Sequence, residues 1–76
     1  MEKQTIIRAL ECEVASLELR LENCTELLGI LRSPKEGGGG LVGNPTEIKN
    51  FELEAAQCEG RLEGIRRAIN LVRSVT

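Results

Sequence analysis

The feature that most constrains this chain is a pair of apolar seams with heptad spacing. Steps of three and four residues alternate without a break in the first seam: Ile7, Leu10, Val14, Leu17, Leu21, Cys24, Leu28 and Leu31. The same steps recur in the second seam: Ile48, Phe51, Ala55, Cys58, Leu62, Ile65, Ile69 and Val72. A mean period of 3.5 residues is typical of a left-handed coiled coil. The chain is therefore predicted to be all-α, with two amphipathic helices packed along their length.

The predicted helices span residues 3–32 and 45–74, and a glycine-rich loop at 33–44 joins them. The first helix should end before Pro34, because the residue preceding a proline is pushed out of the α region. A connection this short relative to the helices favours an antiparallel coiled-coil hairpin. Residues 1–76 are expected to form this single helical-hairpin domain.

The second helix has a clear predicted start. Asn44 suits the N-cap, Pro45 suits the first helical position, and Glu47 completes an approximate capping box. Folding the seams back on each other predicts the layers Leu31–Ile48, Leu28–Phe51, Cys24–Ala55, Leu21–Cys58, Leu17–Leu62, Val14–Ile65, Leu10–Ile69 and Ile7–Val72. The loop is long enough to permit a slip of one layer.

A second apolar surface lies away from the seam on each predicted helix. On the second helix it comprises Leu53, Ala56, Gly60, Gly64, Ala68 and Leu71, with Val75 beyond. On the first helix it comprises Cys12, Ala15, Leu19 and Ile30, beside Ile6 and Leu27. Helices that are apolar on two sides usually belong to larger bundles. We therefore expect a homo-oligomer, a four-helix dimer or a larger even assembly; the alternative is that the two helical glycines are merely tolerated.

The composition argues against catalysis and metal binding. The chain has no His and no Asp, all twelve acidic residues are Glu, and the formal net charge is −2. Three cysteines without a Cys-x-x-Cys pair or any His do not form a zinc motif. We expect no enzyme, no cofactor, no bound metal and no duplex nucleic acid as partner. No segment looks like a signal peptide or membrane span, so a cytoplasmic protein with reduced thiols is expected.

Arginines form one candidate ligand site. Arg66, Arg67 and Arg73 should lie at the open end of the hairpin, with Arg8 beside them on the neighbouring helix and Lys3 close by. Several arginines brought together by symmetry would hold phosphate groups well. The alternative interpretation is ordinary pairing with neighbouring glutamates such as Glu11 and Glu13.

Four consecutive glycines at 37–40 form the second candidate. The amides of Gly38, Gly39 and Gly40 precede a helix N-terminus, which is a favourable place for an anion. The run lacks the Gly-Lys-Ser/Thr ending of a P-loop, so a flexible turn, natural or introduced as a linker, is the simpler interpretation. The two candidate sites are predicted to lie about 40 Å apart, so one small ligand would need an oligomer to reach both.

The plan of a short acidic helical hairpin with apolar outer faces and an arginine cluster resembles small phage-encoded anti-defence proteins. Members of that class assemble from helical hairpins and sequester cyclic nucleotide signals. The resemblance covers residues 3–74 and is one of architecture, so no binding residue is carried over from it. The same plan also resembles generic bacterial coiled-coil adaptors.

Two functions follow from this sequence as expectations. The first is a non-enzymatic oligomeric binding protein that sequesters a small anionic ligand, such as a cyclic nucleotide, in the host cytoplasm if the gene is of phage origin. The second is a structural or adaptor coiled coil that binds or inhibits another protein, such as a host protein. The arginine cluster favours the first. The lack of aromatic residues other than Phe51 favours the second, since nucleotide bases usually stack on aromatic rings.

Overall fold

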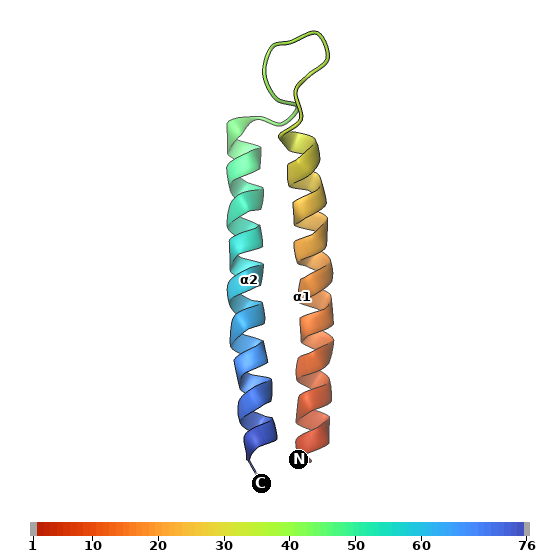
Figure 1. The fold of residues 1–76 in the computed structure, drawn as a ribbon, viewed down its shortest axis with the longest axis vertical. Coiled ribbons are helices and arrows are strands. Elements are labelled where there is room, and N and C mark those ends of the chain that lie inside the picture. Colours follow the sequence, from red (N-terminus) through yellow and green to blue (C-terminus); the bar gives the residue numbers. More distant parts are fainter. Residues whose placement is uncertain (1, 76) are drawn as a thin grey trace.

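Two long antiparallel helices make up the fold (Figure 1). The structure, a computed structural model, describes residues 2–75 and contains α1 (Lys3–Leu31) and α2 (Pro45–Ser74). The described chain measures 61 × 14 × 14 Å. The loop lies at one end of this rod, and the start of α1 and the end of α2 lie together at the other. The predicted all-α antiparallel hairpin is confirmed.

The hydrophobic core is a single seam between the two helices. Among residues 2–75, seven side chains are buried, and every one belongs to the predicted heptad seams: Ile7, Leu17, Cys24, Leu28, Cys58, Leu62 and Ile69. In the middle of the rod, Leu17, Cys58 and Leu62 form one cluster, and Val14, Leu21 and Ile65 pack against it. These six residues make up three successive layers of the predicted register. The heptad spacing therefore places one stripe of each helix against the other and leaves the remaining faces in solvent.

The helix ends follow local sequence signals. α1 ends at Leu31, one residue earlier than expected: the Arg32 amide still donates to the Leu28 carbonyl at 2.9 Å, but the Ser33 amide donates only three residues back, to the Ile30 carbonyl, at 3.1 Å. At the start of α2, the Glu47 amide donates to Oδ1 of Asn44 at 2.8 Å. The Asn44 amide in turn donates to Oε1 of Glu47 at 3.3 Å. Both bonds of the expected capping box are therefore present.

The loop is a turn closed by backbone hydrogen bonds. The Lys35 amide donates to the Gly40 carbonyl at 2.9 Å, and the Val42 amide donates to the Ser33 carbonyl at 2.8 Å. A single antiparallel bridge joins Pro34 and Leu41. Between these contacts the four glycines have φ values from 81° to 102°. Residues with a Cβ rarely adopt this conformation, so glycine is required by the path of the turn.

Gly43 is the glycine with a packing role. It is buried, its amide donates to the Leu31 carbonyl at 2.9 Å, and its backbone passes directly against the Leu31 side chain. A Cβ at position 43 would lie 2.7 Å from Cβ of Leu31 and 2.6 Å from its Cδ2. Because the Leu31 Cβ is fixed to the helix backbone, it cannot move aside as a side-chain tip can. The absence of a side chain at Gly43 lets the chain turn closely over the end of α1.

Replacing Gly43 with alanine is expected to lower the free energy of unfolding by about 1–3 kcal/mol, because the new methyl group overlaps Leu31. Gly29→Ala is the matched control: a Cβ there meets no atom within 4 Å. Its better helix propensity should raise stability by about 1 kcal/mol. Urea unfolding followed by circular dichroism, at one protein concentration for all variants, measures both effects. Equal stability of Gly43→Ala and the parent chain would contradict the close approach.

Candidate functional surfaces

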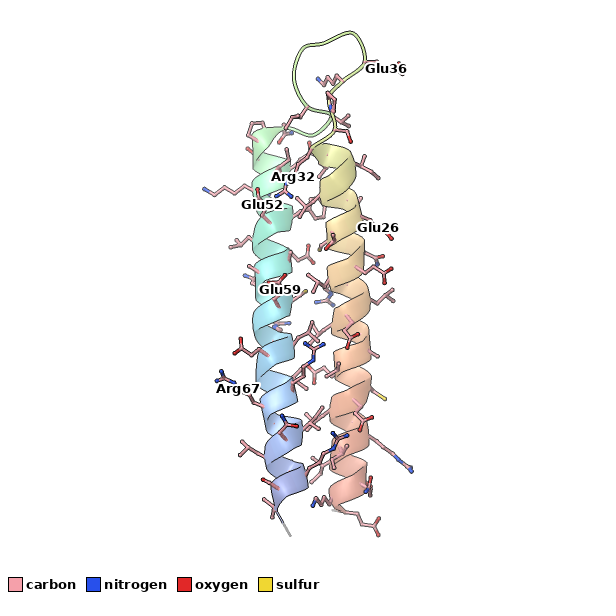
Figure 2. All side chains as sticks on the ribbon, viewed as in Figure 1. Glu26, Arg32, Glu36, Glu52, Glu59 and Arg67 are labelled. Carbon is pink, nitrogen blue, oxygen red and sulfur yellow. The ribbon has the colours of Figure 1, made fainter. Side chains whose placement is uncertain are left out.

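Three ion pairs cross one flank of the hairpin at heptad intervals. They are Arg32–Glu52 at 3.2 Å, Glu18–Arg66 at 3.3 Å and Glu11–Arg73 at 3.3 Å. Figure 2 labels the pair nearest the loop, Arg32 and Glu52. All six side chains are more than half exposed. Exposed pairs of this kind contribute about 0–1 kcal/mol each, so their main effect is to favour one register of the two helices.

Three of the four arginines in the candidate cluster form ion pairs with glutamates. Arg66 and Arg73 bridge to glutamates of α1, and Arg67 pairs with Glu63 on its own helix at 2.8 Å. Arg8, the fourth candidate, is exposed on α1. The pairing of Arg73 with Glu11 is the alternative considered for this cluster from the sequence. Within one protomer, three of the four arginines therefore have a carboxylate beside them.

A shallow groove of about 730 Å³ runs along the same flank between the helices. Leu21 and Leu62 provide its apolar lining. The polar lining consists of Glu18, Glu22, Thr25, Glu26, Glu59, Glu63, Arg66, Arg67 and Asn70. Five glutamates against two arginines leave this groove with a formal charge of −3. An anionic ligand that approached Arg66 or Arg67 here would be repelled by the surrounding carboxylates.

At the open end of the rod, Lys3 of α1 caps the C-terminal end of α2. Nζ of Lys3 donates to the carbonyl oxygens of Arg73 and Val75, at 2.9 and 2.6 Å. These carbonyls belong to the last turn and C-cap of α2, where backbone acceptors have no partner within the helix. Lys3 therefore joins the start of α1 to the end of α2, a role that heptad spacing alone does not reveal.

The glycine loop lies at the opposite end of the rod from the end of α2 (Figure 1), whose last turn contains Arg73. Of the three candidate amide donors, that of Gly38 already donates to the Lys35 carbonyl at 3.3 Å. Gly39 and Gly40 complete the same exposed turn. The structure therefore does not bring the loop amides and the arginines together within one protomer.

The outer face of α2 carries the residues predicted to form an oligomer interface. Leu53 and Leu71 are 59% and 67% exposed. Ala56, Gly60 and Gly64 are exposed between them, and Ala68 is half-buried near the edge of the helix pair. A Cβ added at either glycine would meet no atom within 4 Å. Nothing in the hairpin itself therefore requires glycine at these two positions, although each costs helix stability of about 1 kcal/mol relative to alanine.

Exposed apolar side chains are not confined to that face. The larger ones on the rod are Leu19, Leu27, Ile30, Leu53, Leu71 and Val75, and Leu41 and Val42 are exposed in the loop. In an elongated hairpin with one seam of buried side chains, this exposed surface favours self-association.

The cysteines differ in environment. Cys12 is exposed, whereas Cys24 and Cys58 are each 3% exposed in the core. Burial raises the pKa of the Cys24 thiol, and the nearby Glu54 carboxylate and Cys58 raise it further. Cys24 therefore stays protonated at neutral pH, which makes it a poor nucleophile.

Residues 2–75 hold no cluster of three or more Cys and Glu side chains placed to bind a metal ion. Within the same residues, neither helix is both long and apolar enough to cross a membrane. No protein family, no characterised protein and no solved structure matches this chain significantly. What the chain shares with helical-hairpin proteins is therefore the architecture of two antiparallel helices.

The free energy of unfolding should fall as the pH rises above 9.0, the ordinary pKa of the thiol. The unfolded chain releases the Cys24 proton near that pH, whereas the folded chain holds it to a higher pH, so alkaline conditions favour unfolding. Urea unfolding at several pH values between about 8 and 10.5 measures this slope for the parent chain and for Cys24→Ala. The variant should have a lower free energy of unfolding at every pH, but that free energy should decline less steeply as the pH rises. Identical slopes would show that Cys24 does not contribute.

Proposed function

We propose that this chain is a non-enzymatic oligomeric binding protein, a structural or adaptor coiled coil that self-associates and presents its remaining surface to a protein partner. The observation that carries this proposal is the outer face of α2. There, Leu53 and Leu71 are more than half exposed, and two glycines have open space above them. A face with these properties is suited to a close helix–helix contact rather than to solvent.

The small size of the hydrophobic core supports the same proposal. The buried side chains form one row between two helices, and no third element covers either outer face in the described part of the chain. Small domains that bury little apolar surface often depend on oligomerisation for stability. Association of two hairpins would bury a second layer and increase the share of apolar side chains removed from water.

The chemistry of the side chains supports a binding role over an enzymatic one. Catalysis by Cys or Glu needs a partner that activates the group inside a cleft. The chain has no His to act as a base, and the buried thiols lie in an apolar seam. The glutamates of the groove are exposed on a shallow surface, where their carboxylates are solvated.

Light scattering on the purified chain should give the mass of a dimer or a larger assembly of the 8.3 kDa chain. The double variant Gly60→Leu and Gly64→Leu should shift the chain toward the monomer, because bulky side chains would hold the helices apart. Leucine is a better helix former than glycine, so the variant should keep its helical circular dichroism spectrum. Gly29→Leu, at a helical glycine on α1 that also has open space, is the control and should not change the mass. A stable monomer of the parent chain would contradict the proposal.

Sequestration of a small anionic ligand, such as a cyclic nucleotide, is a second candidate function. One observation favours it: the Arg67 side chain is 77% exposed and points away from the hairpin (Figure 2). Its carboxylate partner is on its own helix, so no interhelical contact would be lost if it turned to a ligand. Because Arg66 lies in an acidic groove within one protomer, this function depends on an assembly that adds basic groups from other copies.

Thermal-shift measurements against a panel of cyclic di- and trinucleotides test this second candidate. A genuine ligand should raise the melting temperature in a concentration-dependent way, and added salt should weaken the effect. Arg66→Ala with Arg67→Ala should abolish the shift and leave the mass unchanged. Arg20→Ala with Arg61→Ala, which removes two other exposed arginines, is the matched control and should retain it. No shift with any nucleotide would leave the adaptor function as the proposal.

A further inference from the structure

We propose that the partner of the α2 outer face is the α2 outer face of a second copy, in an antiparallel crossing whose two-fold axis passes between Gly60 and Gly64. This inference rests on the proposed self-association and specifies its geometry. Four features of the described chain lead to it: the order of residues along the face, the inclination of the row of small residues, the open space at the glycines, and the distribution of charge along the rod.

The six small and apolar residues of this face between Leu53 and Leu71 have the same order from either end. The sequence of types is Leu, Ala, Gly, Gly, Ala, Leu, at positions 53, 56, 60, 64, 68 and 71. The spacings of three, four, four, four and three residues are also symmetric. In a two-fold interface the same patch serves both subunits, so residue i meets residue j and residue j meets residue i. A face that is symmetric about its own midpoint satisfies this requirement when the two helices run in opposite directions.

The inclination of the small-residue row sets how the helices cross. Residues at four-residue steps, here Ala56 to Ala68, form a row inclined about 26° to the helix axis. Two such rows align when the helices cross at about −50°. Crossing helices are closest at one point and diverge on either side of it. The glycines lie at that point, the alanines come next, and the leucines lie beyond, so side-chain size increases as the gap widens.

The open space at the crossing point is a separate observation. Apart from the adjoining backbone of α2 and the chain neighbours, neither Gly60 nor Gly64 has an atom of its own protomer within 4 Å of the position of a Cβ. Leu62, between them in sequence, is buried in the seam and 3% exposed. The glycines therefore lie on the side of α2 that faces away from α1, where a second helix backbone can approach without contact with α1.

The charge distribution selects the antiparallel arrangement. The loop half of the rod, residues 18–59, has eight glutamates and four basic residues, a formal charge of −4. The open half, residues 2–17 and 60–75, has four glutamates and six basic residues, a formal charge of +2. An antiparallel crossing near the middle of the rod places the acidic half of each copy toward the basic half of the other. A parallel arrangement would place like charges together, which is unfavourable.

Distances between nitroxide labels test the geometry. Cys12→Ser removes the exposed thiol, and the buried Cys24 and Cys58 remain unlabelled in the folded chain. A single cysteine is then introduced by Glu63→Cys, next to the proposed axis, or by Lys49→Cys, two heptads away on the same side of α2. In the antiparallel dimer, the two copies of a label at position 63 should be less than about 20 Å apart. The two copies at position 49 should be roughly 35–40 Å apart.

Each alternative outcome has a defined meaning. Short distances at both positions would indicate parallel helices and overturn the inference. A long distance at position 63 in a protein that has the mass of a dimer would place the contact on another face, and would overturn this geometry while leaving self-association intact. A monomer mass with no coupling between labels would contradict the proposed function itself. If the inference is correct, Gly60→Leu with Gly64→Leu should abolish the coupling between the two copies of each label, because the dimer no longer forms. Gly29→Leu should leave both label-to-label distances unchanged.

Discussion

Burial of a single apolar seam between α1 and α2 is the interaction on which the rest of the structure depends. Each helix contributes one residue to each layer, and the central layers are closed by Leu17 and Leu62 and by Leu21 and Cys58. A seam of this width covers only one stripe of each helix, and the rod is 14 Å across in both short directions. The hydrophobic effect therefore sets the pairing and direction of the helices but leaves much of their surface open to other contacts.

The charged residues beside the seam act as a second, weaker constraint. The three interhelical ion pairs recur at the same heptad position, so a slip of one layer would break all of them at once. Because these pairs are exposed, they discriminate between registers more than they stabilise the fold. The same pairing lowers the amount of basic charge available to a ligand. Arg66 and Arg73 are positioned by the coiled coil itself, and their carboxylate partners come with them.

On the outer face of α2, the residues present are not the ones that the stability of the hairpin alone would favour. Helix stability favours alanine or larger residues, and the packing within the hairpin leaves room for them at positions 60 and 64. The glycines of the loop have a local explanation in their positive φ values, and Gly43 has one in the Leu31 contact. Gly60 and Gly64 have no such explanation within the hairpin. A close approach by another helix would explain why glycine is present at these positions. An assembly of this kind would also reduce the exposure of Leu53 and Leu71.

Sequence patterns are enough to predict the helices, their antiparallel pairing and the central layers of the core. Heptad periodicity and capping residues are local patterns that act along the chain. α1 nevertheless ends one residue earlier than expected, at Leu31. The tertiary structure decided that Arg66 pairs with Glu18, that Lys3 caps α2, and that Gly43 passes against Leu31. These features depend on distances between residues far apart in sequence, and such distances become defined only when the seam has closed and the two helices lie side by side.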